Sequence, residues 1–285
     1  MRPVYVTNEA LEDFIDRALA EDIGDGDHST LASVPDDASN SAYLIMKESG
    51  VIAGMELASL IFHKLDTEIK LEHLATDGDR VEAGDIILKI KGNAQAILSG
   101  ERLLLNCMQR MSGIATKTAG LNKLISGTKA KLLDTRKTTP NMRMLEKWAV
   151  LIGGGVNHRY GLYDMIMLKD NHNDFAGGIS QAVTATKDYL KRTGKTLKIE
   201  VETRDLTEVK EALEVGGVDS IMLDNMTTSE MSEAVALIAG RSETEASGGI
   251  TETTIRSVAQ TGVDFISVGA LTHSIKSLDI SLKAQ

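Results

Sequence analysis

Several residue types and patterns are scarce in this sequence of 285 residues. A single cysteine, Cys107, cannot form an internal disulfide or a cysteine-based zinc site. The longest uninterrupted apolar run, from Ala234 to Ala239, is far shorter than the roughly 20 residues that a membrane-spanning helix needs. The first residues contain no apolar stretch of the kind that secretory signals carry. These absences predict a cytoplasmic protein without membrane contact.

Aromatic residues and positive charge are also limited. Aromatic residues make up 4% of the chain, and the net charge is −10. Nucleic-acid binding needs a positive surface and benefits from aromatic stacking, so the composition argues against a nucleic-acid partner. Lysine and arginine nevertheless concentrate between Lys129 and Lys169, where eight of them stand against three acids. This basic island predicts a pocket for a small anion, although a solvated basic helix face fits the charge count equally well.

The first hundred residues combine helical segments with alternating strands. Asn8–Ala20 and Met55–Leu65 carry apolar residues at helical spacing, while Ser41–Lys47 and Ile69–Leu74 alternate as strands do. The hairpin that begins at Asp77 lacks the lysine that a biotin or lipoyl carrier domain presents, and we interpret it as structural.

A long helical stretch comes next, and β/α alternation follows it. The helix is predicted over Leu98–Ile125, with an interruption near Ser112 and Gly113. Amphipathic helices such as Thr227–Ala239 then separate short apolar strands. This alternation predicts right-handed crossovers and a parallel sheet, either a barrel or an open doubly wound sheet. The expected strands are Lys131–Thr135, Met165–Lys169, Leu197–Glu202, Asp219–Asp224, Thr244–Ser247 and Asp264–Val268.

Each of these strands ends in charged residues, amides or glycine. The ends are Asp134–Lys137, Lys169–His172, Glu200–Glu202, Asp224–Asn225, Ser247–Gly249 and Ser267–Ala270. Parallel β/α sheets bind ligands at the carboxyl ends of their strands, so these six ends predict one functional rim. The glycines at the last two ends favour a phosphate monoester, because the chain has neither a Walker motif nor a strand-linked dinucleotide motif.

The basic island would supply this rim with cations for a ligand that carries more than one negative group. These cations are Arg136, Lys137, His158, Arg159 and Lys169. Glu202 and Asp224 would face them, where they can hold ribose hydroxyls, bind Mg²⁺ or stabilise a cationic transition state. A salt-bridge network without catalysis is the alternative, and the desolvation of so many charges disfavours it. For His158 alone, a role in fixing its loop is the stronger interpretation.

Long motifs in this chain resemble those of one enzyme family. They are Asp134-Thr-Arg-Lys-Thr-Thr-Pro140, Gly153–Arg159, Lys169–His172, Leu223–Asn225 and Glu245–Gly249, within a resemblance that runs from Glu21–Asp27 to Ser267–His273. The chain resembles the quinolinate phosphoribosyltransferases, also called carboxylating nicotinate-nucleotide pyrophosphorylases, of de novo NAD biosynthesis. Two departures, Leu151 in place of a commonly basic residue and the sequence His28–Thr30, remove no group assigned below.

The resemblance implies an α/β protein with two domains. Residues 1–112 would form an N-terminal α/β open-faced sandwich, and residues 113–271 an incomplete parallel β/α barrel that carries the catalytic site. The segment 272–285 would pack back onto the first domain. The resemblance also implies a homodimer in which Arg102 completes the partner's site, and it leaves assembly into a hexamer open.

The resemblance further implies a role for individual residues. Lys137, Lys169, Glu202 and Asp224 would be the catalytic residues. Quinolinate would be held by Arg136, His158, Arg159 and Lys169, while Arg102 would reach into the partner's site. Phosphoribosyl pyrophosphate would contact Lys137, Glu202 and Asp224, partly through Mg²⁺, to which Glu202 and Asp224 are possible ligands. Thr135 would also bind substrate. Its 5′-phosphate would meet Ser247, Gly248, Gly249, Val268, Gly269 and Ala270.

The implied reaction converts quinolinate and phosphoribosyl pyrophosphate into nicotinate mononucleotide, pyrophosphate and CO₂. Positive charge that develops on the ribose suits the carboxylates of Glu202 and Asp224, while Mg²⁺ and the cations offset the leaving charge. Two alternatives stay open. One is a sibling transferase with another acceptor, of the type associated with molybdate transport, and the other is a non-catalytic protein that binds a phosphorylated metabolite.

Overall fold

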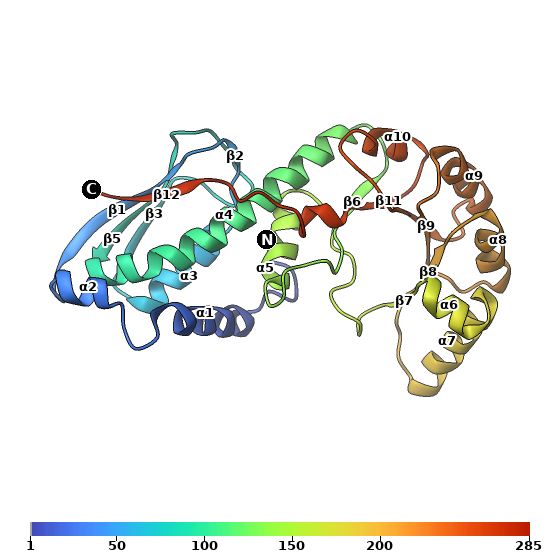
Figure 1. Cartoon of the computed structure of the whole chain (residues 1–285), viewed down its shortest axis with the longest axis horizontal. Helices are drawn as coiled ribbons and strands as arrows, with labels where there is room; N and C mark the ends of the chain where they lie inside the picture. Colours follow the sequence, from blue (N-terminus) through green and yellow to red (C-terminus); the bar gives the residue numbers. More distant parts are fainter. Residues whose placement is uncertain (1) are drawn as a thin grey trace. The chain divides into compact units, whose positions relative to one another are not determined.

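The structure, a computed structural model, describes residues 2–285 and divides into two compact units (Figure 1). The first unit joins the residues up to Ala119 with Thr138–Gly154 and Leu271–Gln285. The second unit consists of Gly120–Lys137 and Gly155–Ala270. Among residues 2–285, the helices are too short or too polar to cross a bilayer.

A four-stranded antiparallel sheet forms the centre of the first unit. Its order is β12-β1-β5-β3, so the central strand β1 has the late strand β12 on one side and β5 on the other. Met46 of β1 pairs with Ile280 of β12. The strands are β1 (Ser39–Met46), β3 (Lys70–His73), β5 (Ile86–Asn93) and β12 (Ile280–Ala284), and β2 (Gly50–Val51) pairs separately with β4 (Arg80–Val81).

Helices accompany this sheet, and near the start of three of them a side chain accepts hydrogen bonds from backbone N–H groups. Thr7 accepts a hydrogen bond from the backbone of Ala10 and starts the first helix, while Asp27 caps the second in the same way. Asp77 accepts from the backbone N–H groups of Gly54 and Met55 at the start of the third. The helices of this unit are α1 (Asn8–Ile23), α2 (His28–Ser33), α3 (Met55–Leu65), the first part of α4 (Ala94–Leu124) and α5 (Arg143–Ile152).

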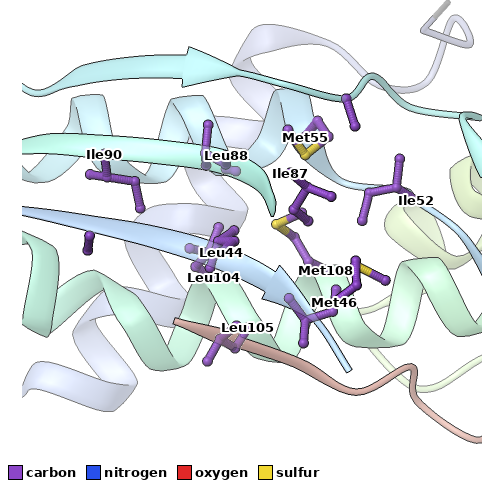
Figure 2. Packing of buried hydrophobic residues seen from close by; sticks show 14 of the residues in the cluster. Leu44, Met46, Ile52, Met55, Ile87, Leu88, Ile90, Leu104, Leu105 and Met108 are labelled. Carbon is purple, nitrogen blue, oxygen red and sulfur yellow. The ribbon is translucent and has the colours of Figure 1, made fainter. Parts of the chain in front are cut away.

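The main packed cluster of the first unit consists of apolar side chains. Leu44 of β1 and Leu88 of β5 have no exposed surface, and they pack with Leu104 and Met108 of α4 (Figure 2). Alternation along β1 places Leu44 and Met46 on the same, buried face. Burial of such aliphatic side chains is the main stabilising contribution of this unit.

The predicted interruption of the long helix at Ser112 and Gly113 is wrong, since α4 is continuous from Ala94 to Leu124. Both residues have another purpose. The Ser112 hydroxyl accepts from the Ala53 N–H and donates to the Ala53 carbonyl, at 3.0 and 3.2 Å. A Cβ at position 113 would lie 2.4 Å from the carbonyl oxygen of Lys276. Glycine therefore permits a close backbone approach here rather than ending the helix.

One buried ion pair joins α4 to α5. The guanidinium of Arg110 lies 2.6 Å from Glu146, whose side chain is fully buried. Arg110 also donates to the Thr272 carbonyl, and the second oxygen of Glu146 accepts from the Thr139 N–H. Each oxygen of this buried carboxylate therefore has a donor.

A six-stranded parallel sheet forms the second unit, in the order β6-β11-β10-β9-β8-β7. From β7 to β11, strands that are consecutive in sequence are neighbours in the sheet. A doubly wound sheet would reverse direction along its order, so this arrangement is that of an incomplete β/α barrel, as predicted. The strands are β6 (Lys131–Leu133), β7 (Ile166–Leu168), β8 (Ile199–Thr203), β9 (Ser220–Asp224), β10 (Glu243–Ser247) and β11 (Phe265–Ser267).

Helices follow the strands of the second unit as crossovers. Thr227 and Glu230 form a reciprocal capping box at the start of the helix after β9, in agreement with the sequence pattern. The helices are α6 (Asp170–Ala176), α7 (Ile179–Thr193), α8 (Leu206–Val215), α9 (Thr228–Ile238) and α10 (Ile255–Gln260), with a 3₁₀ turn η1 at Gly269–Leu271.

Candidate active site

All the candidate residues except Arg102 lie in the second unit, at or just beyond the carboxyl ends of its strands. Because every strand pair in this sheet is parallel, these ends share one edge. Arg102 is an exposed residue of α4 in the first unit.

Asp134 organises the end of β6. Its side chain is fully buried, and its two oxygens accept from the Asn157 amide at 2.7 Å and from the His158 N–H at 2.8 Å. Val156 forms a parallel bridge with Leu133, which extends the contact along the strand. The segment 156–159 is thereby held against β6, although it is far away in sequence.

The imidazole of His158 lies between two buried glutamates. Its Nε2 is 2.9 Å from Glu200 and 3.3 Å from Glu245, and all three side chains are less than one-tenth exposed. Its Nδ1 accepts a hydrogen bond of 2.7 Å from the Arg159 N–H. The two carboxylates therefore stabilise a proton on Nε2. Burial raises the pKa of Glu245, to about 7.

Two arginines of the site have no carboxylate partner among residues 2–285. The Nε of Arg136 is buried and makes no hydrogen bond within this part of the chain. Arg159 donates only to neutral acceptors, the Met165 carbonyl at 3.2 Å and the Met167 sulfur at 3.5 Å. Burial and then the positive charge of Arg136 lower the pKa of Arg159. Neighbouring cations with neutral partners favour an anionic ligand, because a carboxylate would relieve both desolvation and repulsion.

Lys169 and Glu202 form the next part of the rim. Their charged groups lie 3.3 Å apart, with Lys169 half exposed and Glu202 largely buried. The backbone N–H of Lys169 donates to His172 at the start of α6, and Asn173 donates to the Glu202 carbonyl. The structure therefore gives His172 and Asn173 the role of holding the backbone of these two strand ends.

Asn225 connects the end of β9 to the end of β10. Its amide donates to Asp224 at 2.7 Å, and its backbone N–H donates to the Ser247 carbonyl at 2.9 Å. Gly248 has a φ of 90°, and a Cβ at that position would lie 2.2 Å from the Asn225 oxygen. Gly248 is required here both for its backbone conformation and for this contact. Asp224 is consequently tied to the glycine-bearing loop that starts at Ser247.

At the end of β11, one backbone N–H group is already used within the sheet. The Val268 N–H donates to the Leu133 carbonyl and belongs to the ladder between β11 and β6. Gly269 and Ala270 follow in the 3₁₀ turn.

Thr135 and Lys137 lie just after β6. The Thr135 hydroxyl accepts a hydrogen bond from the Lys137 N–H at 3.0 Å, and the Lys137 side chain is exposed.

The sequence indicates no role for Glu200 or Glu245, which the structure buries in strands β8 and β10. One signal was available for Glu200. It precedes Glu202 by two residues in a strand, so both side chains lie on the same face of the sheet. Nothing in the sequence paired either glutamate with His158.

Comparisons with known proteins cover nearly the whole chain. The family model "Quinolinate phosphoribosyl transferase, C-terminal domain" matches residues 114–283, and the corresponding N-terminal domain model matches residues 27–112. The chloroplastic carboxylating nicotinate-nucleotide pyrophosphorylase of Arabidopsis thaliana is 49% identical over 290 residues, which cover 96% of this chain and 82% of the relative. A probable carboxylating nicotinate-nucleotide pyrophosphorylase of Bacillus subtilis is 42% identical, over 95% of this chain and 92% of the relative. The structure of the nicotinate-nucleotide pyrophosphorylase from Francisella tularensis superposes with a TM-score of 0.90 at 40% identity and 98% coverage of both chains.

Proposed function

The chain belongs to the quinolinate phosphoribosyltransferase family, and we propose that it carries out the reaction of that family at the rim of its parallel sheet. The enzyme is a decarboxylating phosphoribosyltransferase that produces nicotinate mononucleotide in NAD biosynthesis. One observation carries the assignment of residues. Arg136 and Arg159 are close enough to interact through their charges and have no carboxylate hydrogen-bond partner among residues 2–285, so they suit a ligand with two carboxylates.

Quinolinate would bind to these arginines and to Lys169. Guanidinium groups hold carboxylates through paired N–H donors, whereas the lysine ammonium contributes a single point charge. His158 contributes in another way, since both of its ring nitrogens already have protein partners. We assign it the role of holding the segment that carries Arg159.

Phosphoribosyl pyrophosphate would lie along the ends of β8 to β11. Glu202 and Asp224 would face the ribose, where the positive charge that develops at C1 in the transition state is stabilised by carboxylates. Ser247, Gly248 and Gly249, with the backbone of Gly269 and Ala270, would receive the 5′-phosphate. The Val268 N–H is engaged with Leu133, so we expect no phosphate contact from that group. Thr135 and Lys137 would contact the pyrophosphate.

We propose Mg²⁺ as the metal cofactor. The donor set fits, because Glu202 and Asp224 offer carboxylate oxygens from adjacent strands and Mg²⁺ prefers oxygen ligands shared with substrate phosphates. When bound, Mg²⁺ would neutralise charge on the leaving pyrophosphate. Loss of CO₂ follows transfer of the phosphoribosyl group. In this decarboxylation the chain would hold the pyridine ring and exclude water while the carboxylate departs.

We propose a homodimer in which the partner subunit's Arg102 completes each site. Arg102 is exposed on α4, as an inter-subunit contact requires. Mixing Arg102→Ala with Lys169→Ala subunits would then restore activity, because one site of each mixed dimer has both residues. Failure to restore activity after confirmed subunit exchange would contradict a shared site.

The cellular location is a further proposal. Some curated relatives are named chloroplastic and others mitochondrial. The single cysteine of this chain, Cys107, is a buried free thiol, and burial raises its pKa to about 12. An unreactive reduced thiol suits a reducing compartment, and we propose the cytoplasm.

The test of the function is product formation from quinolinate, phosphoribosyl pyrophosphate and Mg²⁺. We expect nicotinate mononucleotide and CO₂ in equal amounts, measured together in one reaction. Turnover with a different acceptor and none with quinolinate would keep the transferase class and overturn the substrate. Binding without turnover of any acceptor would favour a non-catalytic protein.

A further inference from the structure

Glu200 and Glu245 form a buried acidic pair that the proposed chemistry does not use. They belong to β8 and β10, which are separated in the sheet by β9, and their side chains are 1% and 2% exposed. Two carboxylates inside one sheet repel each other and lose hydration, which is costly unless another group compensates. The group between them is His158, which the segment after α5 brings into the sheet.

A metal ion is one explanation for such a cluster. The ligand atoms of His158, Glu200 and Glu245 lie within 4.8 Å of one another. The hydrogen bond at Nδ1 of His158 argues against a bound metal ion. Nδ1 accepts from the Arg159 N–H, so Nδ1 carries the lone pair and Nε2 carries the proton. A protonated Nε2 cannot coordinate a metal, and it donates toward the two carboxylates instead.

The His158 ring therefore links strands β8 and β10 to the backbone of Arg159. On one side, Nε2 is held by Glu200 and Glu245. On the other, Nδ1 fixes the Arg159 N–H, which is one residue from the His158 N–H that Asp134 binds. Among residues 2–285, the Arg159 guanidinium donates hydrogen bonds to two neutral acceptors, at 3.2 and 3.5 Å, while Glu200 and Asp164 act on it through charge without a hydrogen bond. Its placement consequently depends on the backbone that the ring holds.

We propose that Glu200 and Glu245 are positioning residues for quinolinate, which act by clamping the His158 ring and thereby aiming Arg159 at the substrate carboxylate. This inference rests on the proposed function, because it takes Arg159 as a quinolinate ligand. It assigns a substrate-specific role to two residues that touch neither substrate.

The direction in which quinolinate affinity changes when Glu245 is neutralised distinguishes this proposal from simple charge repulsion. A glutamate near an anion site repels the anion, so neutralising it would tighten quinolinate binding if charge alone mattered. Neutralisation also weakens the clamp on His158, because a neutral amide is a poorer acceptor than a carboxylate. The positioning role therefore predicts weaker quinolinate binding from the removal of a negative charge.

The experiment compares Glu245→Gln with Glu243→Gln. Glu243 is two residues away on the same strand, but it is exposed and pairs with Lys198 at the surface, so it serves as the matched control. Quinolinate affinity is measured by calorimetry on the full-length protein, and KM is measured for both substrates. We expect Glu245→Gln to weaken quinolinate binding about tenfold, the size of one charge-assisted contact, with KM for phosphoribosyl pyrophosphate changed less than about twofold. Glu243→Gln should change neither quantity.

A double-mutant cycle then tests the route through the imidazole. If Glu245 acts through His158, Glu245→Gln should have no further effect on quinolinate affinity in a His158→Ala background. Additive effects in the cycle would overturn the proposal, as would unchanged or tighter binding in Glu245→Gln alone. If Glu245→Gln does not fold, Glu200→Gln answers the same question on β8. A parent protein that binds no quinolinate would instead reject the proposed function, so the two failures are distinguishable.

Discussion

The antiparallel sheet of the first unit and the parallel sheet of the second unit bury different kinds of side chain. The main cluster between β1, β5 and α4 is apolar, and the buried charged residues elsewhere in that unit include Glu146, which has Arg110 at 2.6 Å. Within the parallel sheet, Glu200, Glu202 and Glu245 are all at least nine-tenths buried. The arginines of the second unit's site, in contrast, have no carboxylate partner among residues 2–285.

The difference separates residues that stabilise the fold from residues that bind. Apolar burial stabilises the first unit, whereas the partly buried arginines of the second unit cost desolvation free energy that an anionic ligand would offset. Active sites commonly reduce stability in this way. Substitutions should therefore separate cleanly, with large effects on stability from one unit and large effects on activity from the other.

The largest effect is expected from Glu202→Gln. Loss of a carboxylate that faces the developing ribose charge should reduce kcat by about 10³-fold, which corresponds to ~4 kcal/mol of transition-state stabilisation. The unfolding midpoint in urea should change little, because the Lys169 partner is half exposed and can be hydrated. Steady-state kinetics and urea denaturation of the same preparation check both statements. A large loss of stability with kcat preserved would break the comparison.

Leu44→Ala should produce the converse result. Leu44 is fully buried in the apolar core of the first unit, and its truncation should lower the free energy of unfolding by about 3 kcal/mol through lost burial and the cavity that remains. At temperatures where the variant is folded, KM for both substrates should equal that of the parent. A raised quinolinate KM under those conditions would show that the core of the first unit also tunes the site.

Gly113→Ala is expected to have an intermediate effect, and Gly120→Ala on the same helix is its control. A Cβ at position 113 meets the Lys276 carbonyl at 2.4 Å, whereas a Cβ at position 120 meets nothing within 4 Å. Gly113→Ala should therefore destabilise the protein by about 2 kcal/mol, and Gly120→Ala should stabilise it by up to ~1 kcal/mol through helix propensity. Thermal unfolding of the two variants compares them directly, and a loss of stability in both would contradict the steric explanation.

The smallest effect is expected from Thr227→Ala. The Thr227 side chain accepts from the Glu230 N–H in the capping box of α9, and its removal should cost about 1 kcal/mol. Thr228→Ala, one residue further on, leaves the cap intact and should cost less. Neither variant should change kcat, and urea denaturation with activity measurements would reveal any coupling of α9 to the site.

Much of the fold could be predicted from local patterns. The capping box at Thr227, the strand at Ser220–Asp224 and the parallel sheet are properties of short segments with clear periodicity. The continuity of α4 could not be predicted, because the reason for Gly113 is a backbone carbonyl at Lys276, far away in sequence. From the sequence alone, Gly113 predicts a helix break, and only the close approach of the Lys276 carbonyl explains a glycine inside the helix.

Some candidate residues could be proposed from the sequence because charged side chains stand at the ends of apolar strands. Arg136 and Glu202 stand out because each lies at the end of an apolar strand, and Arg159 stands out because it belongs to the basic island. The pairing of His158 with Glu245 was not predictable, since it depends on how the segment 156–159 enters the sheet. An acid within a strand normally indicates a surface position, and only the fold shows that this one faces a histidine.

The pairing of β12 with β1 has a consequence for biosynthesis. Met46 is translated long before its partner Ile280. The strands of the parallel sheet lie between these two points and are complete before β12 is made. The sheet that starts first is therefore finished last, and until then one edge of β1 lacks its neighbour. Such an open edge can pair with other chains, so cells would be expected to protect the nascent protein with a chaperone during this interval.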